Sequence, residues 1–392
     1  MNQRVMIVAG TRTPIGAMNG SLAGVPAPRL GAVCIAALME RLGIRPHRVD
    51  DVIMGNVVGA GLGQNPARQA ALFAGLAQST PATTINKVCG SGLKAVMLAA
   101  QAIRLGEAGL VVAGGMESMS RAPYLLTKAR EGYRLGHGEL LDAMITDGLW
   151  DVYNQKHMGT CGDLCALERG LNRQEQDDFA VMSFTRARHA IESGWFSREI
   201  APVELKTKGG TTLFKDDECP ARFNEAKLRA LAPAFGGEGT ITAGNASSIG
   251  DGAAAMVIAS PDRCDELGVA PIASIIGATT FAQAPEWFTT APVFAIRKLL
   301  DKVGWTLDQV DLFEINEAFA VVTLHAERAL GLDPARVNVN GGAVALGHPI
   351  GATGARILVT LLAALARTGG RRGVASLCIG GGEAVAIAVE LV

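Results

Sequence analysis

The segment Leu110-Val111-Val112-Ala113-Gly114-Gly115 is an uninterrupted apolar run that ends in glycines. A second run of the same kind is Val374-Ala375-Ser376-Leu377-Cys378-Ile379-Gly380-Gly381. Apolar runs without alternation are typical of strands that are buried on both faces. Each run follows an alanine- and leucine-rich helical stretch, which begins near Gly90 in the first case and near Gly351 in the second. Helices that alternate with buried strands predict an α/β architecture.

The chain repeats this arrangement. Asp51–Asn56 resembles Asp311–Asn316, and each of these segments precedes a Gly-rich turn, the helix and the apolar strand. The shared order of these elements favours an internal duplication; the alternative is a chance likeness between βα units. The strand-like segment Ala253–Ile258 returns the chain to the first half. We therefore expect an N-terminal half of residues 1–118 and 250–271, and a C-terminal half of residues 272–392.

Residues 119–249 differ from both halves, because charged residues, aromatic residues and turns are more frequent there. Asn172 and Glu175 form a capping box, which predicts the start of a helix that ends near Gly194. Gly209-Gly210 within residues 207–212 predicts the turn of a β-hairpin. Insertions of this length are usually functional. We expect an inserted loop domain that covers the substrate.

The composition is that of a globular protein with a large core. Of the 392 residues, 49% are apolar and 19% are charged, which excludes a disordered chain. The formal net charge is -1, so bulk electrostatics recruits neither nucleic acid nor an anionic membrane. An acidic ligand would therefore need local donors.

Targeting signals and disulfides are also not indicated. The 7 cysteines are scattered and odd in number, so they favour a reducing compartment over a disulfide framework. The first residues, Met1–Val8, run straight into a strand-like segment without the features of a signal peptide. Alanine-rich runs such as Ala95–Ala100 are short and interrupted by charge. We expect no membrane span and a cytoplasmic protein.

Cys89 lies in Asn86-Lys87-Val88-Cys89-Gly90-Ser91-Gly92, where a strand gives way to a helix. The positive end of the helix dipole and the free N–H groups there favour the thiolate, which is the nucleophilic form. The two glycines allow the backbone to come close to a ligand. The alternative is a buried cysteine that serves as a small apolar residue.

Two further residues in glycine-rich segments, and one amide, complete the candidate chemistry. His348 lies in a loop just before a helix, which suits proton transfer or stabilisation of an oxyanion better than core packing. Cys378 ends a strand and faces the three glycines Gly380–Gly382, whose N–H groups could stabilise a developing oxyanion; the alternative is a core cysteine. Asn316 follows a strand and could orient a water, although this signal is weak when taken alone.

Metal and nucleotide sites are disfavoured. Cys161 and Cys165 have no partner pair at zinc-ligand spacing, so we expect no metal. The sequence contains no Walker motif, and Gly59–Gln64 does not fit the dinucleotide fingerprint. We therefore expect no cofactor.

At these residues the chain resembles the thiolases, nearly from end to end. The matching segments are Arg12–Gly16, Gly63–Ala70, Asn86–Gly92, Gly114–Ser120, Thr242–Ser247, Asn316–Phe319, Asn338–Gly354 and Cys378–Gly382. The resemblance implies a thiolase-like fold, in which two similar βαβαβαββ-type halves form an αβαβα layered body with an inserted loop domain. This agrees with the repeat and the insertion.

The resemblance is closest to the branch that condenses two acetyl-CoA into acetoacetyl-CoA plus CoA, the acetyl-CoA C-acetyltransferase reaction. It implies a ping-pong mechanism in which Cys89, activated by His348, becomes the acyl thioester. Cys378 then removes an α-proton from the second acetyl-CoA, so that the carbanion attacks the acyl group. One oxyanion hole would use His348 and a water held by Asn316; the other would use the backbone N–H groups of Cys89 and Gly380.

The resemblance also implies the residues that contact coenzyme A. They are Leu149, His157, Met158, Arg222, Phe235, Ala243, Ser247, Ala318 and Phe319. The segment Asp217–Ala232 departs from the family pattern, so the contacts to the nucleotide end are less well defined than those to pantetheine. The family implies a homodimer or homotetramer, the latter through a loop such as Lys128–Leu141.

Three alternatives stay open at this point. A broader-chain 3-ketoacyl-CoA thiolase of fatty-acid β-oxidation is the nearest, although Gly63–Ala70 favours the short-chain branch. A non-catalytic acyl-CoA-binding scaffold is disfavoured because all four candidate catalytic side chains are present. A decarboxylating ketosynthase is disfavoured because that relative has histidine or asparagine where Cys378 stands.

Overall fold

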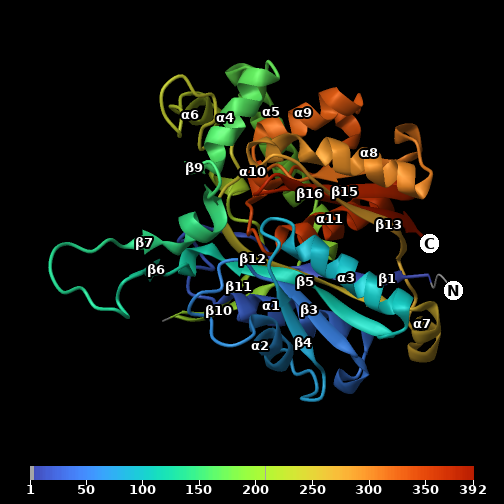
Figure 1. Cartoon of the computed structure of the whole chain (residues 1–392). Coiled ribbons are helices and arrows are strands. Elements are labelled where there is room, and N and C mark those ends of the chain that lie inside the picture. Colours follow the sequence, from blue (N-terminus) through green and yellow to red (C-terminus); the bar gives the residue numbers. More distant parts are fainter. Residues whose placement is uncertain (1–3, 208) are drawn as a thin grey trace.

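A computed structural model describes residues 4–207 and 209–392 (Figure 1). The first three residues of the strand predicted at Met1–Val8, and Lys208 in the predicted hairpin, lie outside these ranges. The strand itself, β1, spans Met6–Arg12.

The N-terminal half contains a five-stranded sheet in the order β1-β12-β5-β3-β4. Its strands are β1, β12 (Gly250–Ala259), β5 (Leu110–Ser118), β3 (Asp51–Gly55) and β4 (Ala82–Ile85). Strand β3 runs parallel to β4 and β5, whereas β12 runs antiparallel to β5 and β1. The short strand β2 (Gly16–Ala17) pairs with the start of β12. The predicted strands at 110–115 and 253–258 are thus confirmed.

The C-terminal half repeats this order as β13-β16-β15-β14. These strands are β13 (Ala273–Ala282), β16 (Glu383–Leu391), β15 (Arg372–Ile379) and β14 (Leu312–Ile315). A parallel bridge between Phe313 and Val337 takes the place of the β3–β4 pairing. The predicted duplication is confirmed, because equivalent strands have equivalent neighbours and directions. Pairing of β1 with β13 joins the two sheets.

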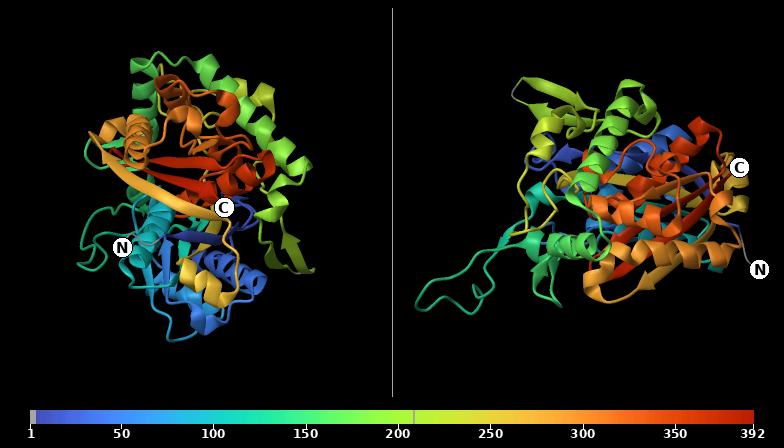
Figure 2. Two further views of the ribbon diagram at one scale, coloured as in Figure 1. Left: turned by 90° about the vertical axis from the view of Figure 1, so that its right-hand side faces the viewer. Right: turned by 90° about the horizontal axis from the view of Figure 1, so that it is seen from above.

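Helices form three layers around the two sheets (Figures 1 and 2). Helices α3 (Ser91–Leu105) and α11 (Thr353–Thr368) lie between the sheets and share the largest apolar core with both. Helices α1 (Ala27–Leu42) and α2 (Pro66–Phe73) cover the outer face of the N-terminal sheet. Helix α8 (Ala291–Val303) and the end of α9 (Ala320–Leu330) pack on the outer face of the C-terminal sheet. The layers are therefore αβαβα, as expected.

By length and composition, the stretch Val88–Leu105 could cross a membrane, and it is the one such stretch among the described residues. In the fold it is largely helix α3, whose apolar face is buried between the sheets. This is the usual position of an apolar core helix in a soluble protein.

The chain between β5 and β12 packs against both halves of the molecule: Val203 joins the core of the N-terminal half, and Met158 packs with Val321 of the C-terminal half. Its helices are α4 (Met158–Glu168), α5 (Arg173–Glu192) and α6 (Glu225–Arg229). Its strands are β6 (Tyr124–Leu125), β7 (Leu141–Asp142), β8 (Trp150–Asp151), β9 (Lys156–His157), β10 (Val203–Thr207) and β11 (Gly210–Phe214). The short helices α7 (Pro261–Leu267) and α10 (Ala343–Leu346) lie outside this segment.

Two local predictions in this segment are confirmed. The Asn172–Glu175 capping box opens α5, and Gly194 has the left-handed conformation just after the helix ends. Strands β10 and β11 form the predicted hairpin. The loop between β6 and β7 projects away from the body (Figure 1). The domain boundaries stay predictions.

Candidate active site

The crossing of α3 and α11 relates the two halves of the molecule. A Cβ on Gly92 would lie 2.7 Å from the backbone N of Ala355, and a Cβ on Gly354 would lie 2.3 Å from the backbone N of Leu93. These reciprocal contacts show that Gly92 and Gly354 occupy equivalent positions across a local two-fold relationship. Only glycine permits helices to approach this closely.

Strand register extends this equivalence to the candidate catalytic residues. Gly55 pairs with Gly115 in the first half, as Ile315 pairs with Ser376 in the second. Residues at equal distances after these pairs therefore correspond: Asn56 to Asn316 one residue later, and Glu117 to Cys378 two residues later. Three residues before Gly92 and Gly354, Cys89 corresponds to Gly351.

Glu117 shows what this correspondence does in the N-terminal half. Its buried carboxylate accepts hydrogen bonds from the Gly351 N–H at 2.9 Å and from the Asn56 side chain at 2.8 Å. It also accepts the N–H groups of Val57 and Val58 at 3.0 and 3.2 Å. The carboxylate thus fastens the loop before α11 to the end of the N-terminal sheet.

The equivalent contact in the C-terminal half brings the two candidate cysteines together. Cys378 occupies the position of Glu117 and Cys89 that of Gly351. A Cβ on Gly90 would lie 2.4 Å from Ile379 Cδ1, so the segments that carry Cys89 and Cys378 lie against each other. A negative charge on Cys89 raises the pKa of the Cys378 thiol. Two thiols far apart in the sequence therefore meet at one point because the loop of one half lies on the sheet of the other.

Cys89 immediately precedes the first turn of α3, as predicted. Val88 before it has a φ of 45°, which is strained for a β-branched residue. Burial raises the pKa of Cys89 to about 11, while the backbone N–H groups of Gly380 and of Cys89 itself lower it. Burial thus opposes the helix N-terminus, and the resting group is a thiol that needs a base.

Cys378 lies near the end of β15 and is fully buried. Burial, and then the neighbouring Cys89, raise its pKa well above the ordinary value for cysteine. It is therefore a neutral thiol at rest. Its thiolate would be a strong base if the reaction itself generated it.

His348 lies in the loop between α10 and α11, as predicted. Burial, and then the nearby Arg356 guanidinium, lower the pKa of His348 to about 3. The imidazole is therefore neutral at physiological pH. Its Nδ1 lies 2.7 Å from Thr353 Oγ1, and its Nε2 lies 3.5 Å from Asn316 Nδ2. Among the described residues, no hydrogen bond joins it directly to the Cys89 thiol.

Asn316 follows the last residue of β14, as expected. Its side chain is buried, and its Oδ1 has no hydrogen-bond partner among the described residues. A buried amide oxygen is costly to leave unpaired. It is therefore available to a water or to a substrate atom.

Gly380 lies in the turn between β15 and β16. The two glycines that follow it have φ values of 90° and 84°. A Cβ on Gly380 itself would lie 3.4 Å from Met158 Sδ. The turn therefore needs Gly381 and Gly382 for its conformation, whereas Gly380 provides close approach to Cys89.

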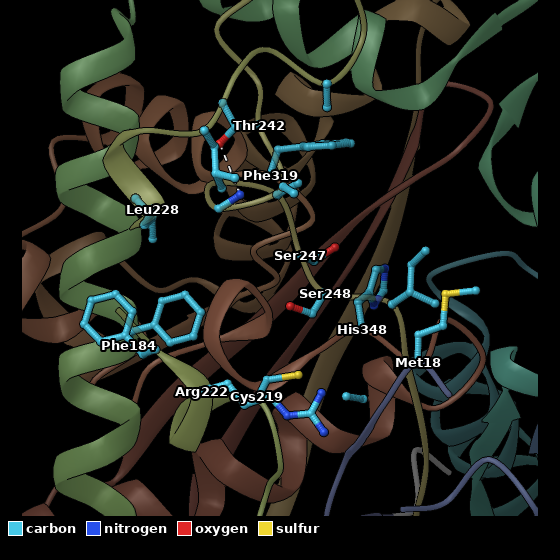
Figure 3. Close-up of a pocket in the computed structure, with 18 of the residues that line it drawn as sticks. Met18, Phe184, Cys219, Arg222, Leu228, Thr242, Ser247, Ser248, Phe319 and His348 are labelled. Atoms are coloured by element: carbon cyan, nitrogen blue, oxygen red, sulfur yellow. Dashed lines mark hydrogen bonds between the residues drawn. The ribbon is translucent and has the colours of Figure 1, made fainter. Parts of the chain in front are cut away.

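A cavity of about 670 Å³ lies beside this centre (Figure 3). In the close-up, Phe184 and His348 lie on opposite sides of the cavity, with Arg222 and Cys219 between them at the lower edge. The cavity is lined by eight of the predicted site residues: Leu149, His157, Arg222, Phe235, Ala243, Ser247, Phe319 and His348.

Six predicted residues do not line the cavity. Met158 and Ala318 pack with Cys378 in one buried apolar cluster, and the Ala318 carbonyl accepts the Ser247 N–H at 3.0 Å. Cys378 and Asn316 are buried and Cys89 and Gly380 are half-buried, and Cys89 packs in the same apolar cluster as the cavity residue Ile350. The structure thus divides the predicted set into a cavity lining and a neighbouring centre.

The cavity lining carries positive charge. Arg222 and Lys227 line it, and no aspartate or glutamate is among the lining residues. Arg222 is paired with Glu218 at 2.5 Å, whereas Lys227 forms no ion pair within the described part of the chain. These are the local donors that an acidic ligand would need in a protein of net charge -1.

Two pairs of stacked aromatic rings line the cavity. The His157 ring stacks on Phe235 at 4.4 Å, and Phe184 stacks on Phe223 at 4.6 Å. Gly159 makes the first stack possible, because a Cβ there would lie 1.9 Å from the Phe235 ring. Flat apolar walls with a few polar groups suit an elongated ligand.

Within the described residues, no group of three or more His, Cys, Asp or Glu side chains could hold a metal ion. All seven cysteines are free. The arrangement can perform covalent thiol chemistry: it offers a half-buried nucleophile, a neutral imidazole, a second thiol and oriented N–H groups.

Sequence reasoning missed several residues of the site. Glu117 lies in a matched segment after a strand, and its equivalence to Cys378 could have been found by aligning the two halves. Thr353 had a weaker signal, since it is five residues after His348 at the start of a predicted helix. No signal in the sequence marks Phe184 or Ile249 as cavity residues.

Comparisons with known proteins agree with this geometry. The family profile of the thiolase N-terminal domain matches residues 5–262, and that of the thiolase C-terminal domain matches residues 269–391. Acetyl-CoA acetyltransferase 2 of Arabidopsis thaliana is 53% identical over 99% of this chain and 97% of its own. Acetyl-CoA acetyltransferase of Pseudomonas aeruginosa is 52% identical over 98% of each chain.

A solved structure shows the same fold. The crystal structure of the Bacillus anthracis acetyl-CoA acetyltransferase matches this one with a TM-score of 0.97 and 42% identity, over 100% of both chains.

Proposed function

The chain belongs to the thiolase family, and we propose that it is an acetyl-CoA C-acetyltransferase, which condenses two acetyl-CoA reversibly into acetoacetyl-CoA and CoA. The observation that carries this proposal is the meeting of Cys89 and Cys378 beside His348 and Asn316. The names of relatives that are about half identical over the full chain support the acetyl substrate.

The first step is acyl transfer to Cys89. The thiol gives its proton to the neutral His348 imidazole as its sulfur attacks the thioester carbonyl. The backbone N–H groups of Cys89 and Gly380, which face the thiol, stabilise the oxyanion. The CoA thiolate leaves and takes the proton of Cys378. This leaves acetyl-Cys89, a protonated His348, a Cys378 thiolate and free CoA.

The second step forms the carbon–carbon bond. The Cys378 thiolate, whose environment makes it strongly basic, removes an α-proton from a second acetyl-CoA. Protonated His348 and a water held by Asn316 Oδ1 stabilise the enolate oxygen. The enolate carbon attacks acetyl-Cys89, and the Cys89 thiolate recovers its proton from His348. Both cysteines and the imidazole return to their resting forms.

The cavity binds coenzyme A in this proposal. The pantetheine arm lies along Leu149, His157, Phe235, Ala243, Ser247 and Phe319, with Met158 and Ala318 behind the reacting end. Lys227 and Arg222 face the phosphates of the nucleotide. Coenzyme A thioesters are substrates here, and the proposal includes no cofactor and no metal.

Three further properties are part of the proposal. The β6–β7 loop exposes Leu126, Tyr133, Leu135 and Leu140, with Leu135 99% exposed. This supports a homo-oligomer: either a dimer, or a tetramer in which two dimers pair through this loop. The seven free cysteines suit a reducing, cytoplasmic location. Fatty-acid metabolism is the proposed context of the reaction.

Peptide mapping by mass spectrometry after incubation with acetyl-CoA tests the proposal. We expect the acetyl group on Cys89 and on no other cysteine. Acetylation elsewhere, with Cys89 unmodified, would refute the assignment.

A broader-chain 3-ketoacyl-CoA thiolase is distinguished from the proposed enzyme by a thiolysis series over chain length. A steep loss of rate beyond the four-carbon substrate is expected. Comparable rates for long and short 3-ketoacyl-CoA would favour the broader enzyme.

A further inference from the structure

Thr353 is the first residue of α11 and is fully buried against the His348 ring. Its Oγ1 lies 2.7 Å from His348 Nδ1 and donates its single proton to the Pro349 carbonyl at 2.9 Å. A hydroxyl has one proton to donate and lone pairs to accept with. Because the proton of Thr353 is directed at Pro349, its oxygen faces Nδ1 as an acceptor.

The opposite side of the imidazole leads to the same tautomer. Nε2 faces the Asn316 side-chain N–H group at 3.5 Å, which is a donor. A donor there disfavours a proton on Nε2. In a neutral imidazole one nitrogen carries the proton and the other a lone pair. Two independent neighbours therefore place the proton on Nδ1 and the lone pair on Nε2.

We infer that Thr353 is a positioning residue that fixes His348 as the Nδ1–H tautomer, so that Nε2 carries the lone pair that takes the proton of Cys89. This inference rests on the proposed function, because it assigns Nε2 as the base for the acyl transfer step. Thr353 touches neither substrate nor the reacting sulfur and acts only through the imidazole.

The equivalence between the two halves supports a dedicated role for this hydroxyl. Thr353 corresponds to Ser91, one residue before Gly92. Ser91 donates its proton to the Val88 carbonyl at 2.7 Å and accepts the Lys87 N–H at 2.8 Å. In both halves, the first helical hydroxyl gives its proton to a carbonyl of the preceding loop and accepts from a loop group. In the C-terminal half that group is the catalytic imidazole.

Two substitutions separate positioning from simple packing. Thr353→Ser keeps the acceptor, whereas Thr353→Val keeps the shape and removes the hydroxyl. We expect Thr353→Val to lower kcat for acetoacetyl-CoA thiolysis by about 10- to 100-fold, since a wrongly oriented histidine tautomer is costly to general-base catalysis. The KM for CoA should change by less than about threefold, because Thr353 lies outside the cavity lining. Thr353→Ser should retain most of the activity.

Thr368→Val is the matched control. Thr368 lies at the other end of α11 and donates to the Ala364 carbonyl at 2.9 Å, four residues back, as Thr353 donates to Pro349. It removes the same kind of helix contact without touching His348, and kcat should stay within about twofold of wild type. Equal losses of kcat in Thr368→Val and Thr353→Val would mean that a weakened helix, and not the imidazole, causes the loss, and would overturn the inference.

Neutron diffraction from deuterium-exchanged crystals of the wild-type protein tests the tautomer without any variant. Deuterium on His348 Nδ1, and a Thr353 hydroxyl deuterium directed at Pro349, are expected. Deuterium on Nε2 with Nδ1 bare would overturn the inference even if the enzyme is fully active. Loss of thiolase activity in the wild type would instead refute the proposed function and leave the tautomer standing.

Discussion

The Glu117 carboxylate holds the Gly351 N–H at 2.9 Å, and this contact is the counterpart of the one between Cys378 and Cys89. A structural carboxylate and a reactive thiol thus occupy equivalent places in the two halves. In the first half the pair fastens a loop to a sheet, and in the second it brings two reactive sulfurs together. The duplication explains the geometry of the active centre.

Glu117→Gln tests the structural member of this pair. The amide retains one acceptor oxygen but directs N–H groups at backbone donors that were paired before. Each buried donor left without a partner costs about 1–3 kcal/mol, so the free energy of unfolding should fall by at least that amount. Urea unfolding measures the loss. Glu107→Gln, the same change at an exposed position, should be neutral. Equal stability of the two variants would contradict the role of Glu117.

Cys378→Ala tests the division of labour between the thiols. Cys89 keeps its oxyanion donors and His348, so acetyl-CoA should still acetylate it, although more slowly without the Cys378 proton. Condensation should stop because no base removes the α-proton. Mass spectrometry measures the acetyl-enzyme, and an acetoacetyl-CoA assay measures turnover. Cys89→Ala is the matched control and should show neither acetylation nor turnover. Residual condensation in Cys378→Ala near the wild-type rate would contradict the assignment.

The turn after β15 gives a prediction that separates neighbouring glycines. Gly382 has a φ of 84°, and a Cβ there would lie 2.3 Å from the Gln283 carbonyl oxygen. Gly382→Ala should lose roughly 2–6 kcal/mol of stability, as backbone strain and overpacking each cost about 1–3 kcal/mol. Gly380→Ala has room beside Met158 and should lose about 1 kcal/mol or less. Thermal unfolding compares the two, and a reversed order would contradict the geometry of this turn.

How much of this could be predicted from the sequence depends on the kind of contact. The duplication can be predicted from the likeness of Asp51–Asn56 to Asp311–Asn316 and from the apolar run that follows each segment, because strands buried on both faces have long apolar runs. Cys89 and Cys378 stood out through their glycine context. Their meeting could not be predicted from spacing, since it depends on the crossing of α3 and α11 at Gly92 and Gly354. The protonation states were equally hidden, because burial sets them and burial is a property of the fold.

The cavity wall was the least predictable part. Phe184 lies on α5, where its spacing is that of any core residue, and only the folded segment brings it against Phe223. The family resemblance predicts several other lining residues but not Phe184 or Phe223. Thr353 was equally hidden, because a threonine at the start of a helix is common and its value comes from the imidazole beside it.

The pKa of His348 gives a prediction about stability and pH. The folded pKa, about 3, lies below the ordinary value of 6.5, so the unfolded chain binds a proton that the folded chain excludes. Excluding this proton contributes to the free energy of unfolding. That contribution is fully present above pH 6.5 and is lost as pH falls toward 3. As pH falls through that window, the free energy of unfolding of the wild type should decrease by about 1.4 kcal/mol per pH unit more than that of His348→Asn, which has no imidazole at this position. Urea unfolding at a series of pH values measures both slopes. Parallel curves would show that His348 does not resist protonation in the fold.

The charge lining of the cavity leads to a prediction about substrate binding. Lys227 lines the cavity without an acidic partner among the described residues, whereas Arg222 is already paired with Glu218. An exposed charge contact is worth up to about 1 kcal/mol, so Lys227→Ala should raise the KM for acetyl-CoA about two- to fivefold. Arg222→Ala should raise the KM at least as much, because its removal leaves the Glu218 carboxylate unpaired near the phosphates. Steady-state kinetics at low ionic strength measures both.

S-acetylpantetheine separates phosphate binding from other effects of Lys227. This substrate carries the reactive arm without the nucleotide phosphates, so Lys227→Ala should leave its KM unchanged. Arg229→Ala is the matched control: Arg229 is two residues away, is paired with Asp178 and Glu225, and does not line the cavity. Rising salt should shrink the difference between wild type and Lys227→Ala for acetyl-CoA, because exposed charges are screened. An equal rise in KM for both substrates would mean that Lys227 shapes the cavity instead of binding phosphate.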